Sequence, residues 1–403
     1  MYKLIVKLAF ANAFLRLSRT ILVIIMIAVS MSMMISIQGL YDGMTLSMID
    51  KIKRSDSGEI SIYAKEYRVS KTLKDSIKNS KKIEEALLAR EDVKAVVLRL
   101  KADGLSSTAR KSAFSTIIGI DLKEEEKFGS FSEFLKEGEL KLGKRGVLLG
   151  KELAKTLKIK IGSKVIFSTQ DSSGEINSVA LKVRGILQTN NIALDSFALY
   201  ISREKLHKFL GVSRSEVTQI AIRTSSLILE DTLKKRYKEL DVKSFLELYP
   251  MIKQMQEIMI IFNSITFFIV MLVVFIGIMG VMYVSILDRV REFGIMRSIG
   301  MSYSLIRLQI FLEAIFLGLL GYIFGALLGY GALSYLLHVG LDLSEFSDGL
   351  ESFGMSSIIY ADIKFSYFSS TFIAIIAASL TSVILPLRKI KKMNSIEVTK
   401  VDI

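Results

Sequence analysis

Four long stretches without charge constrain this chain more than any other feature of its sequence. Only Glu313 interrupts them. The stretches are residues 20–41, 258–287, 308–341 and 365–387. Each can form a helix that crosses about 30 Å of hydrocarbon, which takes about 20 residues. The remaining polar block, residues 42–257, is long enough for one or two globular domains, so we expect four membrane spans and one large domain.

Composition excludes several kinds of site. The chain has 403 residues, 51% of them apolar, and it contains no cysteine. It therefore has no disulfide scaffold and no thiolate metal site. Its two histidines, His207 and His338, lie far apart in the sequence. This spacing does not favour a histidine-rich zinc site or a Ser-His-Asp triad, and we expect no intrinsic catalysis, no metal and no cofactor bound by this chain.

Charge alternates between the short segments that flank the spans. Basic residues gather before the first span, between the second and third, and after the last: Lys3, Lys7, Arg16, Arg19; Arg289, Arg291, Arg297, Arg307; Arg388, Lys389, Lys391, Lys392, Lys400. Acidic residues dominate between the third and fourth: Asp342, Glu345, Asp348, Glu351 and Asp362. The positive-inside rule then places both termini in the cytoplasm and residues 42–257 outside it. The net charge of +14 therefore does not indicate a nucleic-acid partner.

These observations predict an α-helical membrane protein with four transmembrane helices and an extracytoplasmic α+β domain inserted between helices 1 and 2. The predicted segments are a cytoplasmic amphipathic N-terminus (1–19), span 1 (20–41), the outer domain (42–257), span 2 (258–287), a cytoplasmic segment (288–307), span 3 (308–341), an outer loop (342–364), span 4 (365–387) and a cytoplasmic tail (388–403).

Inside the outer domain, residues 58–64 alternate apolar and polar side chains as a half-buried strand does. Leu229, Leu233, Tyr237 and Leu240 have the spacing of one helical face. The residues Asp171, Ser172, Ser173 and Gly174 have the chemistry of a hairpin turn. Such a hairpin tip could dock a partner, although most turns of this kind are only turns.

The cytoplasmic segment between spans 2 and 3 mixes charged and large apolar residues. We expect Phe293, Ile295 and Met296 to bury in a partner's groove, while charged neighbours fix the orientation. The residues that we assign to this contact are Arg291, Glu292, Phe293, Gly294, Met296, Arg297 and Gly300.

The third predicted span carries two features of a packed membrane helix. Gly321, Gly325 and Gly329 recur every four residues and form a stripe that lets another helix approach closely. Glu313 should face protein or water, because an ionised carboxylate in lipid is costly. By helical geometry Arg307 is on another face, so we expect an arginine of the preceding cytoplasmic segment to reach Glu313.

The whole chain resembles the ABC-transporter permease family that contains FtsX, macrolide-exporter and lipoprotein-releasing (Lol) permeases. The resemblance rests on one N-terminal span, a large outer domain and three clustered spans, with specific motifs in between. These motifs are Arg291 to Gly300, Leu312-Glu313-Ala314, Pro386-Leu387-Arg388 leading to Ile396-Glu397-Val398, and the outer-domain element Gly150 to Val165.

This resemblance implies that residues 291–300 form a coupling helix received by a separate ATPase subunit, which would hold ATP and Mg²⁺. Gly150-Lys151-Glu152 is no phosphate loop, since Arg145 and Glu152 stand where that loop needs glycine and serine or threonine. The resemblance also implies a second permease chain, the same or related, in a bacterial inner membrane, with the large domain periplasmic.

Within that family, residues 39–44, 58–61, 185–189 and 194–195 look closest to the lipoprotein-releasing branch. This subgroup implies release of lipoproteins from the inner membrane and a periplasmic lipoprotein carrier, although residues 169–177 form a shorter hairpin than the branch's carrier-binding hook. The alternatives are an FtsX-like scaffold that regulates a periplasmic partner and a macrolide-exporter-like efflux component. For a lipidated cargo we expect a path along membrane lipid beside Met34, Ile37 and Met44.

Overall fold

The computed structural model describes residues 2–13, 17–226, 228–346, 349–350 and 355–392. Several residues that entered the predictions lie outside these ranges: Arg16, Asp348, Glu351, Ile396, Glu397, Val398 and Lys400. The chain divides into two compact units. A helical unit comprises Met1–Thr45, Gln256–Leu343 and Ile358–Ile403, and an outer unit comprises Leu46–Met255 and Ser344–Ser357.

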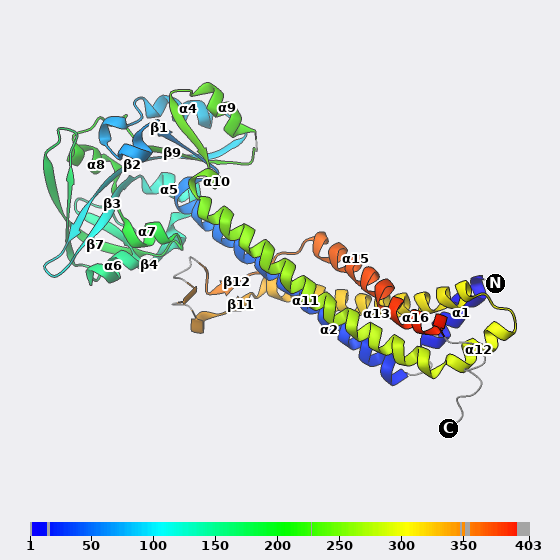
Figure 1. Ribbon diagram of the computed structural model, residues 1–403. Coiled ribbons are helices and arrows are strands. Elements are labelled where there is room, and N and C mark those ends of the chain that lie inside the picture. The colour runs from blue at the N-terminus through cyan, green and yellow to red at the C-terminus, as the bar shows by residue number, and fades with distance from the viewer. Residues whose placement is uncertain (1, 14–16, 227, 347–348, 351–354, 393–403) are drawn as a thin grey trace. The chain divides into compact units, whose positions relative to one another are not determined.

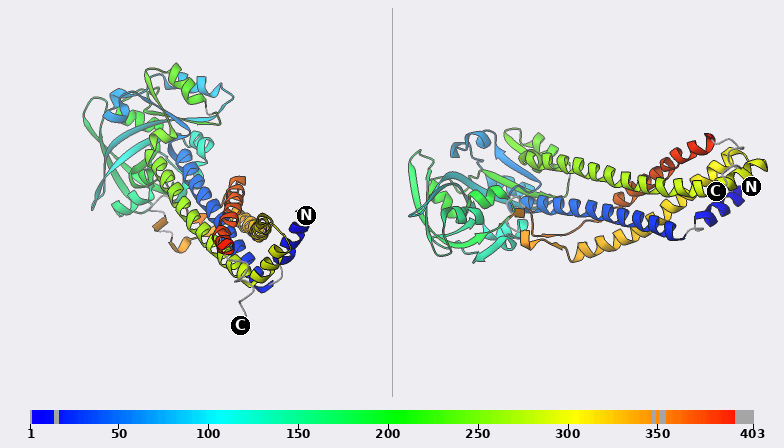
Figure 2. Two further views of the ribbon diagram at one scale, coloured as in Figure 1. Left: turned by 45° about the vertical axis from the view of Figure 1, so that its right-hand side comes forward. Right: turned by 60° about the horizontal axis from the view of Figure 1, so that its bottom comes forward.

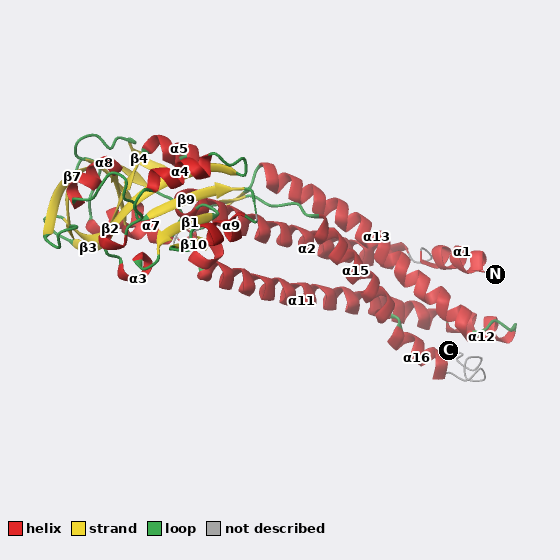
Figure 3. Ribbon diagram, turned by 90° about the horizontal axis from the view of Figure 1, so that it is seen from above, coloured by secondary structure: helices red, strands yellow, loops and turns green. Residues whose placement is uncertain are grey.

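The helical unit consists almost entirely of helix (Figure 3). Its helices are α1 (Tyr2–Ala13), α2 (Leu17–Ile52), α11 (Pro250–Asp288), α12 (Val290–Ser298), α13 (Tyr303–His338), α15 (Phe365–Ser382) and α16 (Ile384–Lys392). Among the described residues, four helical segments are long and apolar enough to cross a membrane: Leu17–Ser57, Pro250–Asp288, Tyr303–His338 and Phe365–Arg388. Strands β11 (Leu341–Asp342) and β12 (Ile358–Ile359) pair between α13 and α15.

The helices differ from the charge-free stretches at their ends. α2 and α11 remain unbroken in every view (Figure 2), and α11 has 39 residues, or about 58 Å at 1.5 Å per residue. Absence of charge identifies lipid-compatible residues, whereas a helix continues through charged residues. The third helix ends at His338, so Leu341 is in a strand. The last apolar stretch breaks at Val383, because Pro386 cannot donate a hydrogen bond to residue 382.

The outer unit contains two strand assemblies. In the first, β1 (Ile60–Ala64), β2 (Val93–Ser107), β9 (Gln219–Thr224) and β10 (Leu240–Ser244) form an antiparallel sheet in the order β10-β1-β9-β2. Helices α4 (Ser80–Leu88) and α9 (Leu229–Arg236) join β1 to β2 and β9 to β10, and both appear at the top of the outer unit in Figure 1. This order is that of a ferredoxin-like βαββαβ unit, here with a long insertion between β2 and β9.

The insertion supplies the second assembly. Its strands are β3 (Ser112–Ile120), β4 (Leu135–Gly138), β5 (Gly146–Gly150), β6 (Lys164–Gln170), β7 (Ile176–Leu187) and β8 (Ala198–Ser202). The pairs β2·β3, β3·β8, β8·β5, β5·β7, β7·β6 and β6·β2 close six strands on themselves. Its apolar core includes Phe167 and Val183, both fully buried.

The remaining short helices of the outer unit connect these strands. They are α3 (Tyr67–Ser70), α5 (Leu122–Gly129), α6 (Lys151–Leu157), α7 (Ile192–Phe197), α8 (Arg203–Leu210) and α10 (Phe245–Leu248). The prediction of one helical face from Leu229 to Leu240 is wrong at its end, because α9 stops at Arg236 and Leu240 begins β10. All four side chains still pack in one core, which explains why their spacing was misleading.

Candidate functional site

The helix α12 between the second and third long helices is a separate short element with defined ends. The turn at Arg289 interrupts the helix that ends at Asp288. At its other end Gly300 has φ +96°, a conformation that favours glycine. Gly300 N–H donates to the Arg297 carbonyl oxygen, and Met301 N–H donates to that of Met296, each at 3.0 Å. These two bonds form a Schellman motif, which ends α12 at a fixed point.

The side chains of α12 divide between the chain's own core and the surface. Phe293 is 3% exposed and packs in the core of the helical unit, and Met296 packs partly against that core. Phe293 is therefore not available to a partner's groove, contrary to the expectation from sequence. Ile295 and Ile299 are 55% and 81% exposed. The charged residues Arg291, Glu292 and Arg297 are exposed as well, and Gly294 is half-buried.

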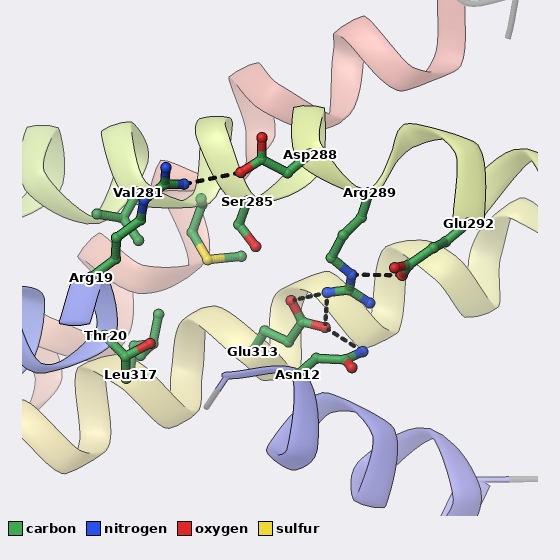
Figure 4. A pocket seen from close by; sticks show the side chains of 11 residues that line it. Asn12, Arg19, Thr20, Val281, Ser285, Asp288, Arg289, Glu292, Glu313 and Leu317 are labelled. Carbon is green, nitrogen blue, oxygen red and sulfur yellow. Dashed lines mark hydrogen bonds and ion pairs between the residues drawn. The ribbon is translucent and has the colours of Figure 1, made fainter. Parts of the chain in front are cut away.

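Glu313 is buried and ion-paired. Arg289 Nη1 donates to Glu313 Oε1 and Oε2 at 3.0 and 3.1 Å, and Arg289 Nε donates to Glu292 Oε2 at 2.9 Å. Asn12 of α1 and Gln309 of α13 each donate a side-chain hydrogen bond to Glu313 Oε1 at 3.2 Å. Figure 4 shows the carboxylate with Arg289 and Asn12 beside it. An arginine that immediately precedes α12 thus joins this helix to α13, and Glu313 in turn accepts from Asn12 of α1.

The three glycines of α13 face α2 within the helical unit. A Cβ atom added at Gly321 would lie 2.6 Å from Ile27 Cβ, and one at Gly325 would lie 2.7 Å from Met31 Cβ. At Gly329 the corresponding distance, to Ile35 Cβ, is 3.2 Å. Real Cβ atoms do not approach another heavy atom within 3.0 Å. At Gly321 and Gly325 the backbone of α13 therefore contacts side chains of α2 directly.

The residues of the expected cargo path do not share one environment. Met34 is fully buried within its own chain, whereas Ile37 and Met44 are half-buried. Met33, one position earlier, is 59% exposed. Met34 is therefore a packing residue of α2, and a molecule moving along this helix would meet Met33 first.

The turn from Asp171 to Gly174 joins β6 to β7 as expected, but it does not project freely. Ser172 N–H donates to the Leu210 carbonyl oxygen, and Ser172 Oγ donates to that of Gly211, both at 3.0 Å. Asp171 Oδ1 accepts from the N–H groups of Ser173 and Glu175 at 2.9 and 3.1 Å. The turn is thus tied to the end of α8.

A buried polar network in the outer unit was not predicted from sequence. Asp56, just beyond α2, accepts from Lys101 Nζ at 2.7 Å and from the Tyr249 hydroxyl at 2.6 Å. Tyr249 immediately precedes α11. Arg99 Nη1 donates to the Asp56 carbonyl oxygen. Burial lowers the pKa of Lys101, and the Asp56 carboxylate partly offsets this shift. The network ties residues next to both long helices to strand β2. Arg99 and Lys101 stand among apolar residues in the sequence, but Asp56 lies in a charged stretch, so the sequence does not show the whole network.

Comparison with known proteins identifies two regions. A model described as MacB-like periplasmic core domain matches residues 20–240, and one described as FtsX-like permease C-terminal matches residues 264–395. The ABC transporter permease YtrF of Bacillus subtilis (strain 168) is 37% identical over 68 residues, which are 17% of this chain and 15% of that protein.

Two solved structures are similar to part of the chain. One is the extracellular domain of the noncanonic ABC-type transporter YknZ from Gram-positive bacteria, which is 15% identical with a TM-score of 0.32. That match covers 46% of this chain and 98% of YknZ's solved domain. The other is the periplasmic region of MacB from Actinobacillus actinomycetemcomitans, which is 18% identical with a TM-score of 0.34 over 52% of this chain and 98% of that structure.

Proposed function

This chain belongs to the family with a MacB-like periplasmic core domain and is an ABC transporter permease of the FtsX/MacB type, and from that premise we propose that it transmits the work of a separate ATPase to the outer domain. The observation that carries the proposal is the exposed face of α12. Ile295 and Ile299 are apolar yet largely exposed, beside three exposed charged residues. A mixed surface of this kind suits a protein partner.

The contacts of α12 with its own chain would pass a force applied by a partner on to the neighbouring helices. Phe293 anchors it in the helical core, and the Arg289–Glu313 pair joins its start to α13. A partner that displaces α12 would therefore move the ends of α11 and α13. Because α11 is unbroken over 39 residues, we expect such a displacement to move this helix as a rigid body. The ATP and Mg²⁺ would belong to the partner ATPase, and a second permease chain would complete the complex.

Two exposed residues at the end of α12, Arg297 within it and Ile299 directly after it, test this role. We expect Ile299→Asp and Arg297→Glu to reduce co-purification of the ATPase subunit about tenfold or more, the effect of losing a central interface side chain. Lys208→Glu, an equally accessible charge change in the outer unit, is the control. Normal ATPase recovery and normal cargo-stimulated hydrolysis with both α12 variants would contradict the coupling role.

For the work done outside, we propose release of lipid-anchored proteins from the outer leaflet of a bacterial inner membrane. Both termini would be cytoplasmic, the large domain would be periplasmic, and a soluble lipoprotein carrier would receive the cargo. Support comes from exposed apolar side chains on α11, including Phe262, Ile265 and Phe268, along which acyl chains could move. Wetting acyl chains costs about 0.8 kcal/mol per CH₂, so release needs both ATP and an apolar path.

Photo-crosslinkers at Met33, Ile37 and Met44 test the cargo. Met33 replaces its buried neighbour Met34, where a probe would report only on the chain's own packing. We expect capture of a lipoprotein when ATP hydrolysis is blocked, and loss of this product in the α12 variants. Capture of only a soluble periplasmic protein would favour the scaffold function, and capture of only a small hydrophobic compound would favour efflux.

A further inference from the structure

The segment between β12 and α15 lies directly against helix α2 of the same unit, near the end of the charge-free stretch of that helix. The Asp362 N–H donates to the Gly39 carbonyl oxygen at 2.9 Å. A Cβ atom added at Gly39 would lie 2.6 Å from the Asp362 carbonyl oxygen, and one added at Gly43 would overlap with that of Tyr360. Glycine at these two positions therefore lets the backbone of residues 360–362 contact α2 without an intervening side chain.

Side chains on both sides fasten this contact. Asp42 of α2 accepts hydrogen bonds at Oδ2 from Lys364 Nζ and, at 2.6 Å, from the Tyr367 hydroxyl. Tyr367 belongs to α15, and it is buried in an apolar cluster with Ile35 of α2 and Leu333 of α13. These contacts form a clasp between α2 and the other two helices, made of residues 360–367 together with Gly39, Asp42 and Gly43.

Helix α2 is also held further along its length. Ile27 and Met31 lie against Gly321 and Gly325 of α13, where the two helices approach closely. The contacts of α2 with its neighbours thus extend from residue 27 to residue 43, or about 24 Å along the helix at 1.5 Å per residue. Separating α2 from α13 and α15 would break all of them.

Helix α11 lacks comparable contacts over much of its length. Its residues Val274, Ile278, Met282 and Ile286 are buried in the core of the helical unit. In contrast, none of the 18 residues 256–273 is buried in the described part of the chain, a stretch of about 27 Å at 1.5 Å per residue. A segment with few buried contacts is displaced at a small cost in free energy. This stretch of α11 can therefore tilt, whereas α2 is held.

We propose that α2 moves as one body with α13 and α15, held by the clasp, while the 256–273 stretch of α11 tilts past it when a partner displaces α12. Helix α11 turns about its contact with Met26 of α2, whose side chain lies against Gly277. The outer domain then receives a relative displacement of α2 and α11, and not a joint movement of both. This inference rests on the coupling role proposed for α12.

Distances between spin labels show which helices move together, and the chain has no natural cysteine that would compete for the labels. One labelled pair is Met33→Cys with Phe268→Cys, across α2 and α11. The matched control pair is Met33→Cys with Leu328→Cys, across α2 and α13. The three natural side chains are 59%, 67% and 57% exposed, so the labels should not disturb the packing of the helices.

Labelled full-length chain is diluted into unlabelled chain and assembled with its ATPase subunit in nanodiscs. Double electron–electron resonance then measures both distances with and without a nonhydrolysable ATP analogue. We expect the α2–α11 distance to change by about 5 Å, the size of a one-turn shift, and the α2–α13 distance by less than about 2 Å. Equal changes in both pairs, or no change in either, would overturn the proposal if the complex binds its ATPase and hydrolyses ATP normally.

The variant Asp42→Asn tests the clasp itself, because it removes the charge that holds Lys364. Helix α2 should then follow α11, so the ATP-dependent change between α2 and α11 should shrink and a change between α2 and α13 should appear. Glu345→Gln, an exposed acid in the same loop, is the matched control. Natural behaviour of Asp42→Asn would show that the clasp does not hold α2 and would overturn the proposal. Failure of the natural chain to bind an ATPase would instead refute the coupling role, and this inference with it.

Discussion

Among the described residues, two arginine–glutamate pairs are buried, one in each unit, and their hydrogen bonds are completed to different degrees. In the outer unit, Arg99 Nε and Nη2 each donate to Glu125 at 2.6 Å, and Nη1 donates to the Asp56 carbonyl oxygen. In the helical unit, Arg289 uses only Nε and Nη1. All three nitrogen atoms of Arg99 are thus satisfied within the chain, whereas one nitrogen atom of Arg289 is not.

This difference separates a pair whose hydrogen bonds are complete from one whose hydrogen bonds are incomplete. A buried ion pair offsets the cost of removing its charges from water only when its remaining hydrogen bonds are made. The Arg99 pair meets this condition inside the domain core, where no further group is needed. The Arg289 pair lies beside a cavity of about 280 Å³, and its last donor has no hydrogen-bond partner among the described residues.

The largest effect is expected for Arg99→Met. This change leaves the Glu125 carboxylate, which is 2% exposed, buried without its partner and should cost about 3–5 kcal/mol. Hydrogen exchange of β2 and α5 in the full chain in micelles measures the loss locally. The double variant Arg99→Met/Glu125→Leu should recover most of it. If hydrogen exchange of β2 and α5 is as slow in the single variant as in the natural chain, the pair does not stabilise the outer unit.

A smaller loss is expected for Arg289→Met. Water entering the neighbouring cavity can solvate the released Glu313 carboxylate, so we expect about 2–3 kcal/mol, less than for a fully enclosed pair. Hydrogen exchange of α12 and of the first turns of α13 measures it. Arg289→Met/Glu313→Met should restore protection. A loss equal to that of Arg99→Met would show that the cavity provides no solvation and would remove the distinction between the two pairs.

Gly325→Ala tests a contact in the helical unit that depends on backbone approach and not on ion pairs. The new Cβ would lie 2.8 Å from the Ala28 carbonyl oxygen, and overpacking of this kind costs about 1–3 kcal/mol. Gly331→Ala is the matched control on the same helix, because nothing lies within 4 Å of its added Cβ. Equal melting temperatures of the two variants in detergent would reject the close contact between α13 and α2.

These pairs show what the sequence could predict. Absence of charge is a local property, so it located four long helices, and the spacing of Gly321, Gly325 and Gly329 identified a face of one of them. The cost of a carboxylate in lipid predicted an arginine partner for Glu313. The choice of Arg289 depends on the turn that separates α11 from α12, and no feature of the sequence distinguished this arginine from Arg291 or Arg297.

Other features depend on contacts between distant parts of the chain. β1 pairs with β9 across the whole insertion. The ferredoxin-like order of the strands therefore cannot be predicted from the periodicity of the sequence. Asp56 contacts Lys101 and Tyr249, which are 45 and 193 residues away along the chain. The expectation for Phe293 failed for a related reason. An amphipathic segment shows which residues are apolar, but not whether its own chain or a partner covers them.

The smallest effect is expected for Arg203→Met, which completes the comparison with a third pair. Arg203 Nη1 and Nη2 donate to Glu124 at 2.6 and 2.8 Å, a geometry as good as that of Arg99 with the neighbouring Glu125. The two pairs differ in their access to water, because the Arg203 and Glu124 side chains are 20% and 30% exposed. Water can replace many of the interactions that Arg203 made with Glu124, so the change should cost about 1 kcal/mol of stability.

Raising the salt concentration to about 1 M should reduce this cost further, because the Debye length falls to about 3 Å, while the cost of Arg99→Met stays the same. Hydrogen exchange of α5 in both variants at both salt concentrations measures the two responses. An equal salt dependence would mean that geometry, and not enclosure, determines the strength of these pairs.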